Sequence, residues 1–139
     1  MAQTHGQIRQ QAVVLVINDK PSLRVSTTSR LYAAGIGTVV TPADVSELLD
    51  SLFPNSPQRP PSFTLIILDY LLEDWVGITF SELLKRVQES ERARVAPIVI
   101  LTAYPQGARN DKSLRKYEVI DAVAAGDTGI DEIVEKYIG

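Results

Sequence analysis

Acidic, amide and hydroxyl side chains stand directly after short apolar segments of the sequence. Asn18 and Asp19 follow the segment VVLVI, and Asp69 follows LIIL. Thr102 follows a third segment, IVIL. Two carboxylates that lie close together repel each other unless a cation lies between them, and their hard oxygen atoms suit Mg²⁺, which keeps several waters and often binds a substrate phosphate. If the fold brings Asp19 and Asp69 together, we expect a magnesium site that can act on phosphate.

The elements that position these residues follow from the apolar pattern. Short segments rich in β-branched residues predict strands. Between them, apolar residues recur with the spacing of a helix. This alternation predicts an α/β fold with a doubly wound, five-stranded parallel sheet covered on both faces. Ligands of such sheets bind beyond the carboxyl ends of the strands, where the polar residues stand. The strands are expected at residues 13–17, 38–40, 65–68, 98–101 and 120–124.

The predicted helices differ in the strength of their apolar pattern. Helices are expected at residues 22–34, 45–52, 80–87, 110–117 and 130–137. The first is weaker because residues 26–29 are all Ser or Thr, and the fourth because Leu114 is its main apolar anchor. Thr41 followed by Pro42 and Asp44 resembles a cap with proline at the first helical position. The proline-rich residues 54–62 predict a surface loop.

Composition and charge limit the classes of protein to consider. The chain has 139 residues, of which 45% are hydrophobic, enough for one core. We expect a polar leader over residues 1–11, without a signal-peptide segment, and one domain over residues 12–139. A net charge of -3 and the lack of a polybasic segment argue against nucleic acid and membrane as partners. These features predict a cytoplasmic protein.

The sequence has few of the residues that common kinds of enzyme site need. The single histidine, His5, lies in the leader, and the chain has no cysteine, so a Ser/His/Asp triad, a thiol nucleophile and a thiolate zinc site are not expected. The segment INDKPS has no glycine, so it lacks the glycine pattern of a dinucleotide site, and its lysine, Lys20, is not the Gly-Lys-Ser/Thr lysine of a P-loop.

The acidic residues also have a simpler interpretation. Asp19 and Asp69 could each cap the helix that follows, and Thr102 could be an ordinary β-branched strand residue. Two aspartates at corresponding positions of two strands, with Thr102 at a third, favour a shared site over separate caps.

Three segments, VLVINDKPSLR, LIILDYLLEDWVG and PIVILTAY, resemble the signature segments of response-regulator receiver domains, in the same order over nearly the whole chain. The resemblance implies a flavodoxin-like (βα)5 architecture. It implies that Asp69 is the phosphoacceptor and that Thr102 is the switch hydroxyl. It also implies a metal site in which Asp19 binds Mg²⁺ directly, together with Asp69 and with Asn18 at the position of the neighbouring acid. It further implies that Leu71 supplies a backbone carbonyl to the metal.

The sequence departs from the receiver pattern at three positions of the site or switch, and in a lesser way at Glu73, where proline is common. Ala125 stands where the family usually has lysine, Ala122 where it often has an aromatic residue, and Asn18 where it often has an acid. Loss of the lysine removes a cation that would pair with the phosphoryl group. The neutral Asn18 lowers the negative charge available to Mg²⁺, so weak metal binding is expected.

Two functions remain open on these grounds. The first is a signalling domain that accepts a phosphoryl group on Asp69, with Mg²⁺, from a histidine kinase or phosphotransfer protein. The second is a pseudo-receiver that binds a partner without phosphorylation. The retained Asp19, Asp69 and Thr102 favour the first, whereas Asn18, Ala122 and Ala125 favour the second. The first is the preferred interpretation, at most with self-catalysed phosphoryl transfer and dephosphorylation as enzymatic activity. A downstream effector and a homodimer are further candidate partners.

Overall fold

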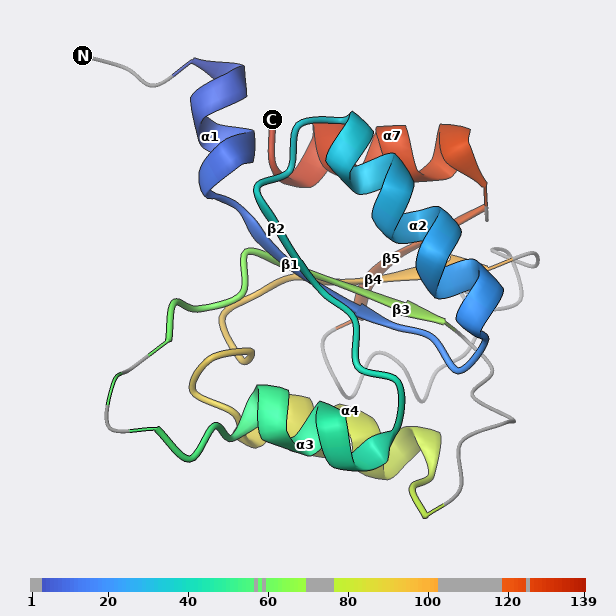
Figure 1. The fold of residues 1–139 in the computed structure, drawn as a ribbon. Helices are drawn as coiled ribbons and strands as arrows, with labels where there is room; N and C mark the ends of the chain where they lie inside the picture. The colour runs from blue at the N-terminus through green and yellow to red at the C-terminus, as the bar shows by residue number, and fades with distance from the viewer. Residues whose placement is uncertain (1–3, 57, 59, 70–76, 103–118, 125) are drawn as a thin grey trace.

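The fold is built on a parallel sheet of five strands in the order β2-β1-β3-β4-β5 (Figure 1). A computed structural model describes residues 4–56, 58, 60–69, 77–102, 119–124 and 126–139. The strands are β1 (Val13–Ile17), β2 (Thr38–Val40), β3 (Leu65–Asp69), β4 (Ile98–Thr102) and β5 (Val119–Ala124). The predicted doubly wound, five-stranded parallel sheet is confirmed, with each strand within one residue of its expected bounds.

Helices cover both faces of the sheet. The described helices are α1 (His5–Gln11), α2 (Pro21–Ala33), α3 (Val45–Leu52), α4 (Phe80–Glu89) and α7 (Asp127–Tyr137). Helices α2 and α7 lie on one face and α3 and α4 on the other (Figure 1). The helix predicted at residues 110–117 lies outside the described residues.

The interior strand β1 shows why the sheet needs helices on both faces. Leu15 and Ile17 belong to the apolar core under α3 and α4, whereas Val14 and Val16 belong to the core under α2 and α7. All five residues of β1 are buried. Because successive side chains of a strand point to opposite faces, a strand with a helix layer on each side is apolar throughout.

Helix α3 has the bounds that its apolar repeat predicts, but it begins later than the start signal at Thr41 suggests. The start predicted at Thr41 and Pro42 is wrong, because Asp44 is the cap and the helix begins at the next residue. The Asp44 carboxylate accepts a hydrogen bond from the backbone N–H of Glu47 at 2.8 Å. A carboxylate at this end also interacts favourably with the helix dipole, so Asp44 is the better cap.

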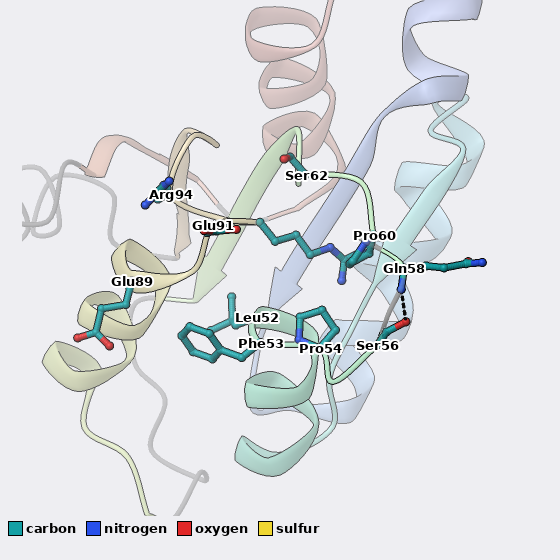
Figure 2. Close-up of a pocket in the computed structure, with 11 residues that line it drawn as sticks. Leu52, Phe53, Pro54, Ser56, Gln58, Pro60, Ser62, Glu89, Glu91 and Arg94 are labelled. Atoms are coloured by element: carbon teal, nitrogen blue, oxygen red, sulfur yellow. Dashed lines mark hydrogen bonds between the residues drawn. The ribbon is translucent and has the colours of Figure 1, made fainter.

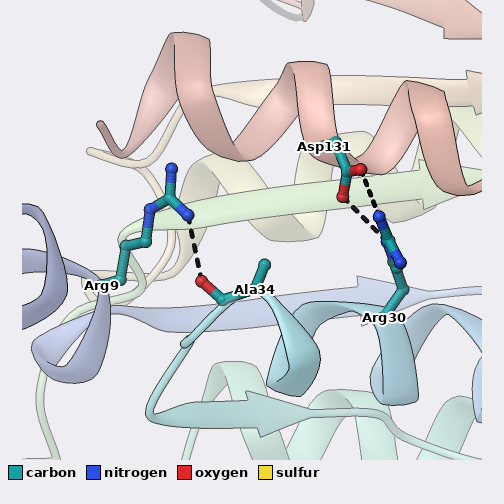
Figure 3. Close-up of polar contacts among 4 residues, drawn as sticks. All are labelled: Arg9, Arg30, Ala34 and Asp131. Carbon is teal, nitrogen blue, oxygen red and sulfur yellow. Dashed lines mark hydrogen bonds and ion pairs between the residues drawn. The ribbon is translucent and has the colours of Figure 1, made fainter.

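Helix α2 buries little and is fixed to α7 by an ion pair. Its buried residues are Thr27 and Leu31, in keeping with its weak apolar pattern. Arg30 donates to both carboxylate oxygens of Asp131, with Nε 2.9 Å from Oδ1 (Figure 3). Hydrogen bonding from Arg30 keeps the pKa of Asp131 below its ordinary value. The pair therefore stabilises the fold at neutral pH and is lost as pH falls through the lowered pKa, although its exposure keeps the contribution small.

Helix α1 lies within the predicted leader and was not expected from the sequence. A reciprocal cap starts it: the Thr4 hydroxyl accepts from the Gln7 backbone N–H at 3.2 Å, and the Gln7 side chain accepts from the Thr4 backbone N–H at 2.9 Å. This capping box satisfies two backbone donors that a helix start leaves open.

Hydrogen bonds join α1 to the rest of the domain. Arg9 donates from Nη1 to the Ala34 carbonyl at 3.1 Å (Figure 3), and from Nε to the Gly139 carbonyl at 3.2 Å. The Arg9 carbonyl accepts from the Gly37 backbone N–H at 3.0 Å. One residue of α1 therefore contacts the ends of both helices on this face of the sheet.

Gly37→Ala is expected to loosen α1. A Cβ on Gly37 would lie 1.8 Å from the Gln10 carbonyl oxygen, so the backbone must move. We expect the free energy of unfolding to fall by about 1–3 kcal/mol in urea denaturation. Gly6→Ala is the control, because a Cβ there meets nothing closer than Thr4 Oγ1 at 3.9 Å. Equal stability of Gly37→Ala and wild type would contradict this account of the α1 contact.

Candidate functional site

Strand register brings the predicted site residues to one edge of the sheet. β1 and β3 are neighbouring parallel strands in which Ile17 is paired with Leu68, so Asn18 and Asp69 follow side by side. In the next pair of strands Asp69 is opposite Leu101, and Thr102 comes one residue later. Neighbouring strands lie about 4.8 Å apart. Asp19, Asp69 and Thr102 thus sit at the carboxyl ends of three consecutive strands.

Three residues at this edge, Asn18, Asp19 and Thr102, are buried. Asp19 is 5% exposed, Asn18 8% and Thr102 6%, while Asp69 is half-buried. Moving a carboxylate out of water is costly unless nearby groups or a cation compensate it. Core packing alone therefore does not explain why a carboxylate, Asp19, is buried at the end of this strand.

The capping interpretation of the two aspartates does not fit the helices that the structure describes. The N-cap of α2 is Lys20, and no side chain caps this helix. The cap of α4 is Thr79, whose hydroxyl accepts from the Glu82 backbone N–H at 3.1 Å. Neither α2 nor α4 uses Asp19 or Asp69 as its cap.

The turn between β1 and α2 is fixed from two sides by Asn18. The Asn18 side-chain oxygen accepts a hydrogen bond from the Lys20 backbone N–H at 3.0 Å. The Asn18 carbonyl accepts from Nη1 of Arg24 at 2.9 Å. Asp19, between Asn18 and Lys20, is carried by this turn. Asn18 therefore acts as a turn residue here, and Arg24 is a contact that sequence analysis missed.

The donor set available to a cation is small. No group of three or more His, Cys, Asp or Glu side chains suited to a metal occurs among the described residues, and the charged oxygen donors that they place at this edge are Asp19 and Asp69. Mg²⁺ fits such a set because it commonly keeps several waters and binds through one or two carboxylates. Leu71 and Ala125 lie outside the described residues. Ala122 is placed only by its backbone, which pairs with Ile100.

A cavity of about 540 Å³ is lined by other residues than these aspartates, and Figure 2 shows the side chains that line it. It is lined by the end of α3, by the segment before β3 and by the loop after α4, with Phe53, Pro60, Glu89 and Arg94 among its residues. These segments lead into the amino-terminal ends of the strands. The cavity and the aspartates therefore occupy opposite edges of the sheet, and we base the candidate site on the aspartates because their chemistry is the more specific.

Arg92 organises the cavity region. It donates from Nε to the Pro61 carbonyl at 2.9 Å and from Nη1 to the Ser51 carbonyl at 3.0 Å. Its guanidinium lies 4.1 Å from the centre of the Phe63 ring. Partial burial lowers the pKa of Arg92, which nonetheless remains a cation. These contacts give Arg92 a structural role that accounts for its position without a ligand.

None of the helices in the described ranges has the length and hydropathy needed to cross a lipid bilayer.

Solved structures of other proteins share this architecture. The receiver domain of a Pseudomonas aeruginosa sensor histidine kinase, described with magnesium coordinated in its active-site cleft, is 22% identical, with 92% of this chain and 98% of that chain covered and a TM-score of 0.67. The chemotaxis response regulator CheY4 of Vibrio cholerae is 21% identical, with 91% and 98% covered and a TM-score of 0.71. A Francisella response-regulator receiver domain is 19% identical, with 91% and 93% covered and a TM-score of 0.64.

These similarities show that the chain has the fold of response-regulator receiver domains, as the sequence segments predicted. No protein-family model matches the sequence, and no curated protein matches it.

Asn18→Ala is expected to weaken the turn that carries Asp19. The substitution removes the acceptor of the Lys20 N–H, and we expect unfolding in urea to show a loss of about 1 kcal/mol. Asn18→Ser is the matched control, because its hydroxyl can accept the same N–H and should retain part of the stability. An alanine variant as stable as wild type would show that the hydrogen bond does not hold the turn.

Proposed function

We propose that this chain is a phosphoacceptor receiver domain of a two-component signalling system, in which Asp69 accepts a phosphoryl group with the help of Mg²⁺. The observation that carries the proposal is the register of β1 and β3, which sets Asp69 beside the turn that carries the buried Asp19. The receiver fold supports it.

The chemistry requires a carboxylate to attack an anionic group. A carboxylate oxygen of Asp69 forms a bond to phosphorus as the phosphorus–nitrogen bond of a phosphohistidine breaks, and the imidazole leaves with the bonding electrons. Bound Mg²⁺ would neutralise charge on the phosphoryl oxygens and favour in-line transfer. Asp19 and Asp69 would hold the ion, with Leu71 expected to add a carbonyl. Thr102 would donate a hydrogen bond to the transferred phosphoryl group, and its movement would couple phosphorylation to a change of the neighbouring surface.

The charge of the turn argues for weak binding of the metal. Asn18 is neutral, and its side-chain oxygen already accepts the Lys20 N–H. A magnesium ion in the cleft of the similar Pseudomonas aeruginosa receiver domain supports the same ion here. With a neutral residue at position 18, the affinity of this chain should be lower than that of a site with three acids.

The proposed partners follow from this chemistry. A sensor histidine kinase or a phosphotransfer protein would supply the phosphoryl group, and an effector protein or domain would read the result. We place these encounters in the cytoplasm. The pseudo-receiver remains the second candidate, because Ala122 and Ala125 stand where receiver domains usually carry residues of the switch.

Acetyl phosphate with Mg²⁺ is expected to phosphorylate the protein. Intact mass spectrometry should show an adduct of one phosphoryl group that is absent without Mg²⁺ and absent from Asp69→Asn, which keeps the shape of the side chain and loses the nucleophile. Asp19→Asn should slow the reaction by at least about tenfold. No adduct in wild type, with acetyl phosphate or with candidate kinases, would leave the pseudo-receiver as the better explanation.

Asn18→Asp is expected to strengthen Mg²⁺ binding. Aspartate can accept the Lys20 N–H as asparagine does and adds a charge to the donor set, so the dissociation constant should fall by about tenfold. Calorimetric titration of Mg²⁺ at constant ionic strength measures this change. Asn18→Ser, which adds no charge, serves as the control. Unchanged affinity in Asn18→Asp would contradict a metal site at this turn.

A further inference from the structure

Arg24 is a cation fixed at the edge of the candidate site. It lies in the second turn of α2, and its Nη1 atom donates to the Asn18 carbonyl at 2.9 Å. The side chain is half-buried. A guanidinium cannot be deprotonated in a protein, so this contact places a permanent positive charge against the end of β1.

Arg24 differs from Arg30 and Arg86 in the group that its guanidinium contacts. Arg30 pairs with Asp131, and Arg86 lies 3.6 Å from Glu89. In the part of the chain that the structure describes, Arg24 contacts a carbonyl and no carboxylate. A backbone carbonyl orients the guanidinium without neutralising it, so its field acts on its surroundings.

The carboxylate next along the chain from this contact is Asp19. Asn18 and Asp19 are consecutive, and the covalent path from the Asn18 carbonyl oxygen to the Asp19 carboxyl carbon limits the distance from Nη1 to that carbon to at most about 10 Å. This is about one Debye length at physiological salt, and part of the intervening space is protein with a lower effective dielectric constant than water. The charge of Arg24 must therefore affect binding of a divalent cation at Asp19.

We propose that Arg24 is a positioning residue of the candidate site whose guanidinium orients the Asn18–Asp19 turn and whose charge lowers the affinity of the resting site for Mg²⁺. The inference rests on the proposed function, because it assumes that Asp19 and Asp69 bind this ion. A phosphoryl group on Asp69 would add negative charge at the same edge, and the positive charge of Arg24 would then be favourable there. Arg24 would thus oppose the metal before transfer and stabilise the charged product after it.

The test is a titration of the full chain with Mg²⁺ at low ionic strength. Arg24→Gln removes the charge and keeps an amide donor, and it should lower the dissociation constant by about three- to tenfold. Arg24→Lys retains the charge and should bind Mg²⁺ with nearly the wild-type affinity. The increase in affinity of Arg24→Gln should shrink at high salt.

Arg30→Gln is the matched control. It makes the same change of charge on the same helix, about 9 Å further along the axis, and should leave Mg²⁺ affinity close to wild type. If Arg24→Gln does not fold, as judged by circular dichroism, Arg24→Met replaces it, because methionine preserves much of the apolar stem.

The outcomes separate this inference from the function on which it rests. If wild type binds Mg²⁺ and Arg24→Gln binds it no tighter, or if Arg30→Gln shifts the affinity equally, the role of Arg24 is refuted and the magnesium site stands. If wild type and all variants fail to bind Mg²⁺, the magnesium site itself is refuted.

Discussion

The parallel pairing of β1 with β3 is the constraint on which the rest of this domain depends. Both faces of β1 are buried, so a slip of one residue would exchange its side chains between the two cores. Packing against helices on both sides thus sets the register, and the register sets Asp69 beside the Asn18–Asp19 turn. The apolar core therefore stabilises a concentration of negative charge that would not form in an open chain.

The sheet and the main helices could be predicted from the sequence because their apolar residues repeat with the period of each element. The sequence was insufficient for α1, whose start depends on a capping box and whose position depends on Arg9. It also misplaced the start of α3, because Thr41 and Pro42 carry a start signal of their own, and only the fold decides that Asp44 is the cap.

The candidate site was predictable to a different degree for each residue. Asp19 and Asp69 could be found because each follows an apolar strand, and the resemblance to receiver domains supplied roles that stay proposals. The resemblance did not foresee the hydrogen bond that Asn18 accepts from Lys20. Arg24 is the last residue of the first signature segment, but its contact could not be predicted, because a long side chain that reaches back six residues to a carbonyl leaves no periodic pattern.

The sheet also separates two regions of different character. The cavity around Arg92 lies where the strands begin, and the aspartates lie where they end, about 16 Å away along a five-residue strand. At that distance ordinary salt screens most of the field of an exposed charge. Changes of charge in the proline-rich segment therefore have little effect on the electrostatics of the aspartates. The two ends of the domain are free to evolve at different rates.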